Sequence, residues 1–180
     1  MILTGNAIVS AIESGEITIS PFERSQVGPN SYDFRLGDRC LTYRDLELDA
    51  KAENPVQRVD VTSKGVLIEP HRIYLFNTLE IIGSTKYVPI IRGRSSIGRL
   101  GLFIDITADL IDIGSINQLT LQLHSVCSIR VFPGMLIGQV TFWCTQGDIT
   151  LYKGKYSNRQ SPCPSLAFRE FRGDPTSRPR

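Results

Sequence analysis

The run RSSIGRLGL, residues 94–102, says most about the fold and the chemistry of this 180-residue chain. It places two hydroxyls, Ser95 and Ser96, between two guanidinium groups, Arg94 and Arg99. Guanidinium groups match the geometry of phosphate oxygens, and hydroxyls and backbone N–H groups at a helix start add neutral donors. The run therefore indicates a phosphate-binding turn. The alternative is a surface turn whose arginines pair with acids.

A carboxylate and small apolar residues follow this run closely. Asp112 can accept a hydrogen bond from a sugar hydroxyl, and Ala108 and Ile111 can lie along a base and sugar. Together with the run, they suit a nucleoside triphosphate. The alternatives are a turn aspartate for Asp112 and plain core packing for Ala108 and Ile111.

Most of the chain beyond residue 17 consists of short segments rich in Val, Ile, Thr, Tyr or Phe, separated by Gly, Pro, Asn and Asp. This pattern predicts strands, and many short strands at roughly regular spacing are typical of an all-β sandwich, jelly roll or distorted barrel. The predicted strands are 31–36, 40–43, 65–68, 73–80, 88–92, 101–106, 118–124, 128–132 and 139–144.

Helical signals are few. Thr4 can cap a short N-terminal helix that Gly15 stops, because the apolar residues between them recur at helical spacing. A single helical turn is expected over 96–100. The charged region 47–64 lacks periodicity and predicts a surface excursion.

The length predicts one domain over residues 1–172. The ending 173–180 is polar and carries two prolines and two arginines, which predicts a mobile tail.

Composition excludes several functional classes. The net charge is only +2, which argues against a nucleic-acid or membrane surface. No apolar run approaches the roughly 20 residues of a membrane span, and the start lacks the features of a signal peptide, so a cytoplasmic protein is expected.

The four cysteines form no C-x-x-C pair, and the sequence also lacks the H-x-E motif of zinc-dependent deaminases, so no zinc site is expected. Cys127 and Cys144 stand in apolar strand contexts and are expected in the core.

Five separated motifs, in order, resemble the dCTP deaminase family of the dUTPase-like superfamily. They are the start MILTG, the segment GPNSYDFRLG over 28–37, the run 93–102, the turn PGMLIGQ over 133–139 and the ending GKY over 154–156. The resemblance implies a distorted β-barrel or jelly roll that assembles as a homotrimer with active sites between subunits.

The resemblance also implies an activity, namely conversion of dCTP to dUTP and ammonia without zinc, with magnesium bound through the triphosphate. Some members also cleave dUTP to dUMP and pyrophosphate. By resemblance, Arg94 and Ser96 face phosphates, Ser95 and Arg99 help to hold the reacting water and orient the catalytic side chain, and Asp112 contacts the 3′-hydroxyl of deoxyribose.

Gln122 departs from this family. The family pattern T-L-E has a glutamate where this chain reads Thr120-Leu121-Gln122. Deamination at C4 of cytosine needs a group that takes a proton from water and returns it to the leaving amine, and a carboxamide does not titrate near neutral pH. Loss of general acid–base help lowers rates by roughly 10²–10⁴.

The loop before Gln122 departs too. The family pattern I-D-P-G-aromatic-x-G is replaced by IDIGSIN over 111–117, and Asp109 stands where many relatives carry glycine. Gln122 could be an engineered trap, a natural divergence to another nucleotide reaction such as pyrophosphate release using Asp112, or the mark of a protein that binds a nucleotide without turnover. The concurrent loop changes favour natural divergence.

The C-terminal region supplies the last candidates. Tyr152, Lys155 and Tyr156 resemble family residues that close over the base and phosphates, and a lysine there offers a mobile point charge. The family commonly places an amide a few residues on. Either Arg159 replaces that amide or Gln160 supplies it after a shift of one residue. The alternative is an exposed basic tail.

Overall fold

The computed structural model describes residues 1–173. Its helices and strands are α1 (Gly5–Glu13), β1 (Ile17–Ser20), the 3-10 turn η1 (Arg24–Gln26), β2 (Tyr32–Tyr43), β3 (Val56–Val59), β4 (Val66–Ile68), β5 (Tyr74–Ser84), β6 (Val88–Gly93), α2 (Ser95–Gly98), β7 (Leu102–Phe103), β8 (Asn117–Ser125), β9 (Ile129–Val131), β10 (Leu136–Trp143) and α3 (Phe168–Phe171).

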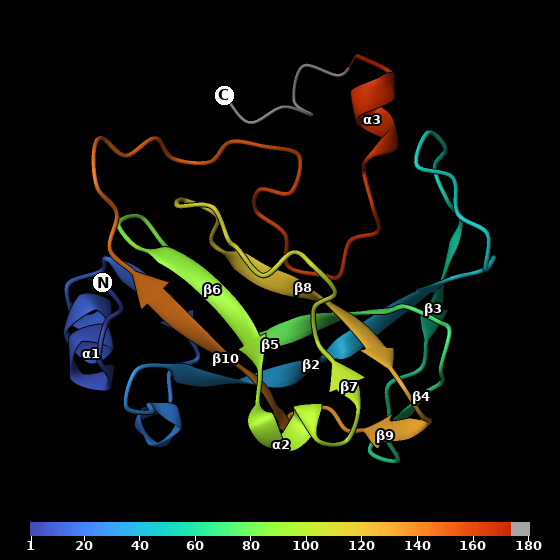
Figure 1. The fold of residues 1–180 in the computed structure, drawn as a ribbon, viewed down its shortest axis with the longest axis horizontal. Helices are drawn as coiled ribbons and strands as arrows, with labels where there is room; N and C mark the ends of the chain where they lie inside the picture. The colour runs from blue at the N-terminus through green and yellow to red at the C-terminus, as the bar shows by residue number, and fades with distance from the viewer. Residues whose placement is uncertain (174–180) are drawn as a thin grey trace.

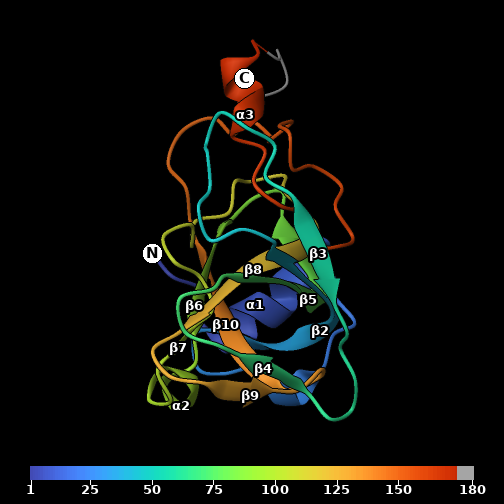
Figure 2. The same ribbon diagram turned by 90° about the vertical axis from the view of Figure 1, so that its right-hand side faces the viewer.

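One antiparallel sheet forms the body of the molecule (Figure 1). Its strand order is β6-β10-β2-β5-β8-β7, with β1 paired to β5 and β3 paired to β2, while β4 and β9 form a separate ribbon. The strands curve around the core, and α1 lies at the far end of the barrel in Figure 2.

The loop before β8 brings the two edges of this sheet together. Leu110 forms an isolated bridge with Ile90 of β6, the N–H of Ile91 donates to the carbonyl of Asp109, and the N–H of Ile111 donates to that of Pro89. The sheet is therefore nearly closed, which confirms the predicted distorted β-barrel.

Alternation along the strands builds the core. In β8 every second residue is buried, so that Leu119, Leu121 and Leu123 point inward while the residues between them are half-exposed. Tyr32 and Phe34 of β2 are completely buried in the same core. This period of two is what a strand with one buried face requires.

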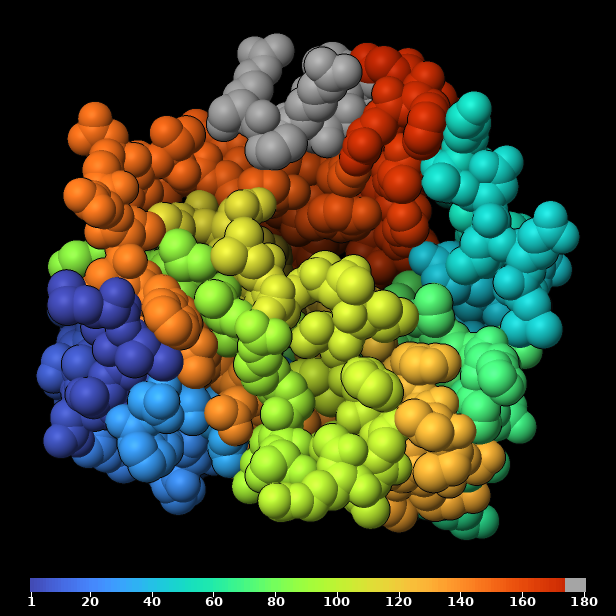
Figure 3. All heavy atoms as spheres, in the orientation of Figure 1, coloured from blue at the N-terminus to red at the C-terminus, as the bar shows by residue number. Residues whose placement is uncertain are grey.

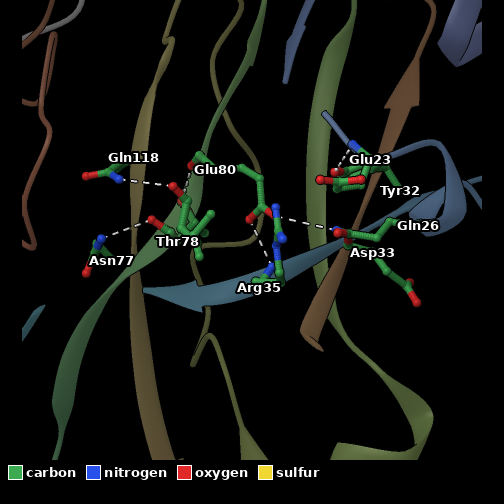
Figure 4. A network of polar contacts seen from close by, with 10 residues as sticks. Glu23, Gln26, Tyr32, Asp33, Arg35, Asn77, Thr78, Glu80 and Gln118 are labelled. Carbon is green, nitrogen blue, oxygen red and sulfur yellow. Dashed lines mark hydrogen bonds and ion pairs between the residues drawn. The ribbon is translucent and has the colours of Figure 1, made fainter. Parts of the chain in front are cut away.

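A polar network crosses the barrel wall where β2 and β5 both shift register (Figure 4). Glu80 is completely buried; its carboxylate accepts from the backbone N–H of Arg35 at 2.9 Å and from Nε of Arg35 at 2.7 Å. Hydrogen bonding to Glu80 raises the pKa of Arg35, so the guanidinium stays charged. Gln26 donates to Glu80 and to the carbonyl of Asp33, which joins η1 to the network.

The predicted elements are largely confirmed, with Thr4 at the N-cap of α1 and a helical turn starting at Ser95. The ranges 31–36 and 40–43 are one long strand, β2. The expected strand 101–106 shrinks to β7, because the chain turns away after Ile104 to reach β6.

The region 47–64 is mostly exposed, as expected of a surface excursion, but it also contains the edge strand β3, which pairs with β2. The expectation for two cysteines was wrong. Cys127 and Cys144 are exposed, not core residues, because each lies just beyond the end of its strand. Of the expected tail, 174–180 lies outside the described residues.

Within residues 1–173, no helix is both long enough and apolar enough to cross a membrane.

Candidate functional site

A cavity of about 490 Å³ lies between β8 and the C-terminal segment, defined here as residues 152–165. It is called the β8 cavity below. Figure 1 shows the C-terminal segment passing above β8, and in the space-filling view of Figure 3 the surface is hollowed beneath that segment. The walls come from β8, from the loop over residues 106–115, from the C-terminal segment and from Tyr43 and Leu75 at the back.

The half-exposed face of β8 forms one wall. Gln118, Thr120 and Gln122 alternate with buried leucines and line the β8 cavity together. The backbone N–H of Gln122 donates to the carbonyl of Ile104, and its side-chain Oε1 accepts from the N–H of Ile106 at 3.5 Å. One backbone and one side-chain hydrogen bond thus hold Gln122 at the cavity wall.

The loop over 106–115 forms the second wall and is fixed by the same bonds that close the barrel. Ile111 is buried and Asp112 is exposed, and both line the β8 cavity with Ala108. Gly114 follows with φ of 90°, a conformation that glycine adopts without steric cost. Its N–H donates to the carbonyl of Ser84. A tight turn thus follows Asp112, an exposed residue of the cavity lining.

The C-terminal segment is held across the cavity by hydrogen bonds at several points. Tyr152 donates its N–H to the carbonyl of Ile113. The N–H of Arg159 donates to Oδ1 of Asn117 at 2.6 Å, and that of Cys163 donates to the hydroxyl of Thr120 at 3.1 Å. The segment is thus fastened to β8 itself, so Tyr152, Tyr156 and Arg159 line the cavity opposite Gln122.

The charge in the β8 cavity is sparse. Among the described residues that line it, Asp112 is the one carboxylate and Arg159 the one cation. Burial raises the pKa of the Cys163 thiol, so Cys163 faces the cavity as a neutral thiol and is a poor nucleophile.

The arginine–serine turn, residues 94–99, lies elsewhere. None of its residues lines the β8 cavity, and Figure 1 shows α2 at the bottom of the view, away from the C-terminal segment. Ser95, Ser96 and Arg99 are exposed. Arg94 is half-buried, and its Nε lies 3.0 Å from the carboxylate of Asp33 on β2.

The remaining candidates are engaged outside the cavity. The ammonium group of Lys155 pairs with Glu170 and lies 5.5 Å from the centre of the Tyr156 ring. Gln160 is exposed, and its carbonyl accepts from Arg39 at 2.7 Å. The structure therefore joins seven of the proposed site residues around one cavity, namely Ala108, Ile111, Asp112, Gln122, Tyr152, Tyr156 and Arg159, and leaves the others apart.

Sequence reasoning missed three residues that shape the site. Gln118 and Thr120 stand at the alternate positions of the strand that carries Gln122, so the period of two could have identified them. Asn117 is buried, accepts from Arg159 and donates to Ser115 at 2.9 Å. Its role depends on a contact 42 positions away in sequence, which no local pattern signals.

The described residues hold no group of three or more His, Cys, Asp or Glu side chains placed to bind a metal ion.

Comparisons with known proteins agree with this architecture. The family model described as dCTP deaminase-like matches residues 2–145. The chain is 41% identical over 172 residues to a protein named dCTP deaminase, dUMP-forming, from Hathewaya histolytica, covering 95% of this chain and 99% of that protein. The protein of the same name from Leptospira biflexa is 40% identical over 172 residues, covering 95% and 98%.

A solved structure adds support for the fold. The crystal structure of 2′-deoxycytidine 5′-triphosphate deaminase from Agrobacterium tumefaciens superposes with a TM-score of 0.63 at 23% sequence identity. The match covers 80% of this chain and 48% of that one, so the chain spans about half of that solved protein. The family model and the curated relatives together show that this chain belongs to the dCTP deaminase-like family.

Proposed function

We propose that this protein is a nucleotide hydrolase of the dCTP deaminase type, acting on a pyrimidine deoxynucleoside triphosphate. The observation that carries the proposal is the β8 cavity, which gathers Ala108, Asp112 and Gln122 in a chain about 40% identical to proteins named dCTP deaminase. Its volume of about 490 Å³ falls within the range typical of small-molecule sites, about 300–1,000 Å³.

The nucleoside end of the substrate occupies the β8 cavity in this proposal. The carboxylate of Asp112 accepts a hydrogen bond from the 3′-hydroxyl, and the small side chain of Ala108 leaves room for the ring. Tyr152 and Tyr156 close the cavity from the C-terminal segment, and the guanidinium of Arg159 adds positive charge near the phosphates. Closure of this kind excludes water from the reacting atoms.

The phosphates are held by the arginine–serine turn of a second copy of the chain. Its exposed hydroxyls and the exposed guanidinium of Arg99 do not line the β8 cavity of their own chain. Apolar side chains near the turn are unusually exposed, namely Leu100, Phe103, Ile106, Leu110 and Val126. Exposed apolar residues of this kind suit an interface. A homotrimer with sites between subunits therefore brings the two halves together.

Magnesium fits this arrangement as an ion carried by the substrate. Magnesium keeps several waters and binds readily through substrate phosphates, and among the described residues that line the cavity the one carboxylate, Asp112, is assigned to the 3′-hydroxyl. When bound, the ion neutralises phosphate charge; Lys155 and Gln160 can assist if the C-terminal segment rearranges.

Gln122 limits the reaction at C4. Water adds to C4, its proton must be removed, and the amine must gain a proton before ammonia leaves and the 4-oxo ring remains. The carboxamide can position water beside Ser95 and Arg99 of the second copy, but it cannot carry the proton. Deamination is therefore about 10²–10⁴ slower than with a carboxylate at this position.

The test compares the protein with its Gln122→Glu variant for ammonia and pyrophosphate released from dCTP with magnesium. If the amide alone limits deamination, the variant releases ammonia about 10²–10⁴ faster. Ammonia from neither protein, despite binding of dCTP, would sink the deaminase assignment and leave a binding protein.

Pyrophosphate release is the second candidate, favoured because Asp112 is the one carboxylate that lines the β8 cavity within residues 1–173. Asp112 would orient a water whose oxygen bonds to the α-phosphorus, while the bond to the bridging oxygen breaks and pyrophosphate leaves. The curated relatives are named dUMP-forming, which agrees with this second reaction. Pyrophosphate without ammonia in the same assay supports it.

A further inference from the structure

We infer that the carboxamide of Gln122 makes the β8 cavity select a pyrimidine with an oxo group at C4 over one with an amino group there. The inference rests on the proposed nucleotide-binding function and names the class of base that the site prefers. It follows from how the amide is oriented and from which of its hydrogen-bonding groups remain free.

A backbone donor favours one orientation of the amide. Oε1 of Gln122 accepts from the N–H of Ile106 at 3.5 Å. Turning the amide over would set its NH2 group against that N–H, donor against donor. The oxygen therefore stays toward Ile106, and the NH2 group points away from it.

The NH2 group of Gln122 is available to a ligand. Within residues 1–173, Nε2 of Gln122 makes no hydrogen bond, although the residue is half-buried at the cavity wall. The neighbours on the same face are already engaged. Nε2 of Gln118 donates to the carbonyl of Leu79 at 3.1 Å, and the hydroxyl of Thr120 accepts from Cys163. The NH2 groups of Gln118 and Asn117 each already donate to a protein acceptor, whereas that of Gln122 donates to none among the described residues.

The C4 substituent of the base decides what this donor meets. The oxo group of uracil or thymine is an acceptor and pairs with the NH2 group. The amino group of cytosine is a donor and leaves both groups unpaired inside a partly enclosed cavity. An unpaired buried donor weakens binding by about tenfold or more.

A carboxylate at the same position reverses this preference. Glutamate has only acceptor oxygens when ionised, so it pairs with the amino group of cytosine and repels the oxo group of uracil. The carboxamide of Gln122 thus changes which base is preferred, in addition to removing the proton transfer that deamination needs.

The test is calorimetric titration with two analogues that resist hydrolysis, α,β-imido dUTP and α,β-imido dCTP, each with magnesium. The protein should bind the uracil analogue about tenfold more tightly, and Gln122→Glu should prefer the cytosine analogue. Gln57→Glu is the matched control, because Gln57 is exposed on β3 and does not line the β8 cavity. It should keep the preference of the unchanged protein. Circular dichroism checks that each variant is folded.

Equal affinities, or tighter binding of the cytosine analogue by the unchanged protein, would overturn the inference and leave the proposed function standing. The same holds if Gln122→Glu keeps the original preference. Binding of neither analogue would instead contradict the proposed function, and the inference with it.

Discussion

The carboxylate of Glu80 is completely buried in the barrel wall, and the guanidinium of Arg35 beside it is only partly exposed. Removing one partner from a buried ion pair leaves the other charge without compensation, whereas removing both is often tolerated. The pair lies next to the register shifts of β2 and β5.

Glu80→Gln should lower the free energy of unfolding by about 3 kcal/mol, because the buried guanidinium loses its counter-charge. Urea denaturation of the two proteins measures the difference. Asp38→Asn is the matched control, since Asp38 lies on the surface, 4.0 Å from Arg39, and such pairs contribute little. An equal effect from both variants would show that the burial of Glu80 does not matter.

The ionised carboxylate of Asp105 lowers the stability of the folded chain in a way that depends on pH. Partial burial, aided by repulsion from Asp109, raises the pKa of its carboxyl above 3.8. The folded chain thus binds this proton more tightly than the unfolded chain, and stability falls as the pH rises through the folded pKa. Asp105→Asn should raise the urea midpoint at pH 7, with the gain shrinking as the pH approaches 3.8. A gain that is constant with pH would contradict this origin.

Individual site residues were predictable where chemistry or spacing marks them. Asp112, Ala108 and Gln122 were identified from the resemblance, and the structure places all three around one cavity. The contact of Arg94 with Asp33 was not predictable, because it joins residues 61 positions apart through the pairing of β10 with both β2 and β6. Which residues act catalytically stays a prediction.

At the level of elements, β10 depends on a close approach that only glycine permits. A Cβ on Gly138 would lie 2.3 Å from the Phe34 ring and 2.6 Å from Ile104, both completely or almost completely buried. The register of β10 against β2 also shifts here. The glycine lets β10 pass over packed core side chains without displacing them.

Gly138→Ala should therefore lower the free energy of unfolding by about 1–3 kcal/mol through overpacking. Thermal and urea unfolding both report the change. Gly93→Ala is the control on the neighbouring strand, because its Cβ would meet only Ile104 at 3.8 Å, an ordinary contact. If Gly138→Ala is as stable as the control, the side chains of Phe34 and Ile104 can shift to accept a methyl group at little cost, contrary to this prediction.

Strands with one buried face were predictable, and elements without such a face were not. β8 alternates strictly, and the prediction 118–124 differs from it by one residue at each end. β3 lies at an edge with little burial, and α3 is only four residues long, so neither leaves a periodic signal. β1 was missed because four residues are too few to separate a strand from a loop.

For the whole molecule, the central claim of the proposed function is that the β8 cavity and the arginine–serine turn of two copies form one nucleotide site. The β8 cavity lies under the C-terminal segment, and the arginine–serine turn is exposed on another part of the barrel. The barrel fold was predictable from five motifs and many short strands. Sites between subunits were expected only from the resemblance, because the separation of the turn from the β8 cavity depends on how the closed sheet places the ends of β6 and β8.

Subunit mixing tests this account most directly. Arg99→Ala removes a guanidinium from the turn, and Asp112→Ala removes the carboxylate from the cavity. Each variant alone should bind α,β-imido dUTP weakly at every site. If the protein forms the proposed homotrimer, about a quarter of the sites in a random mixture should combine an intact turn with an intact cavity and bind with the original affinity. Calorimetry of the mixture that shows no such tight sites would contradict a site shared between copies.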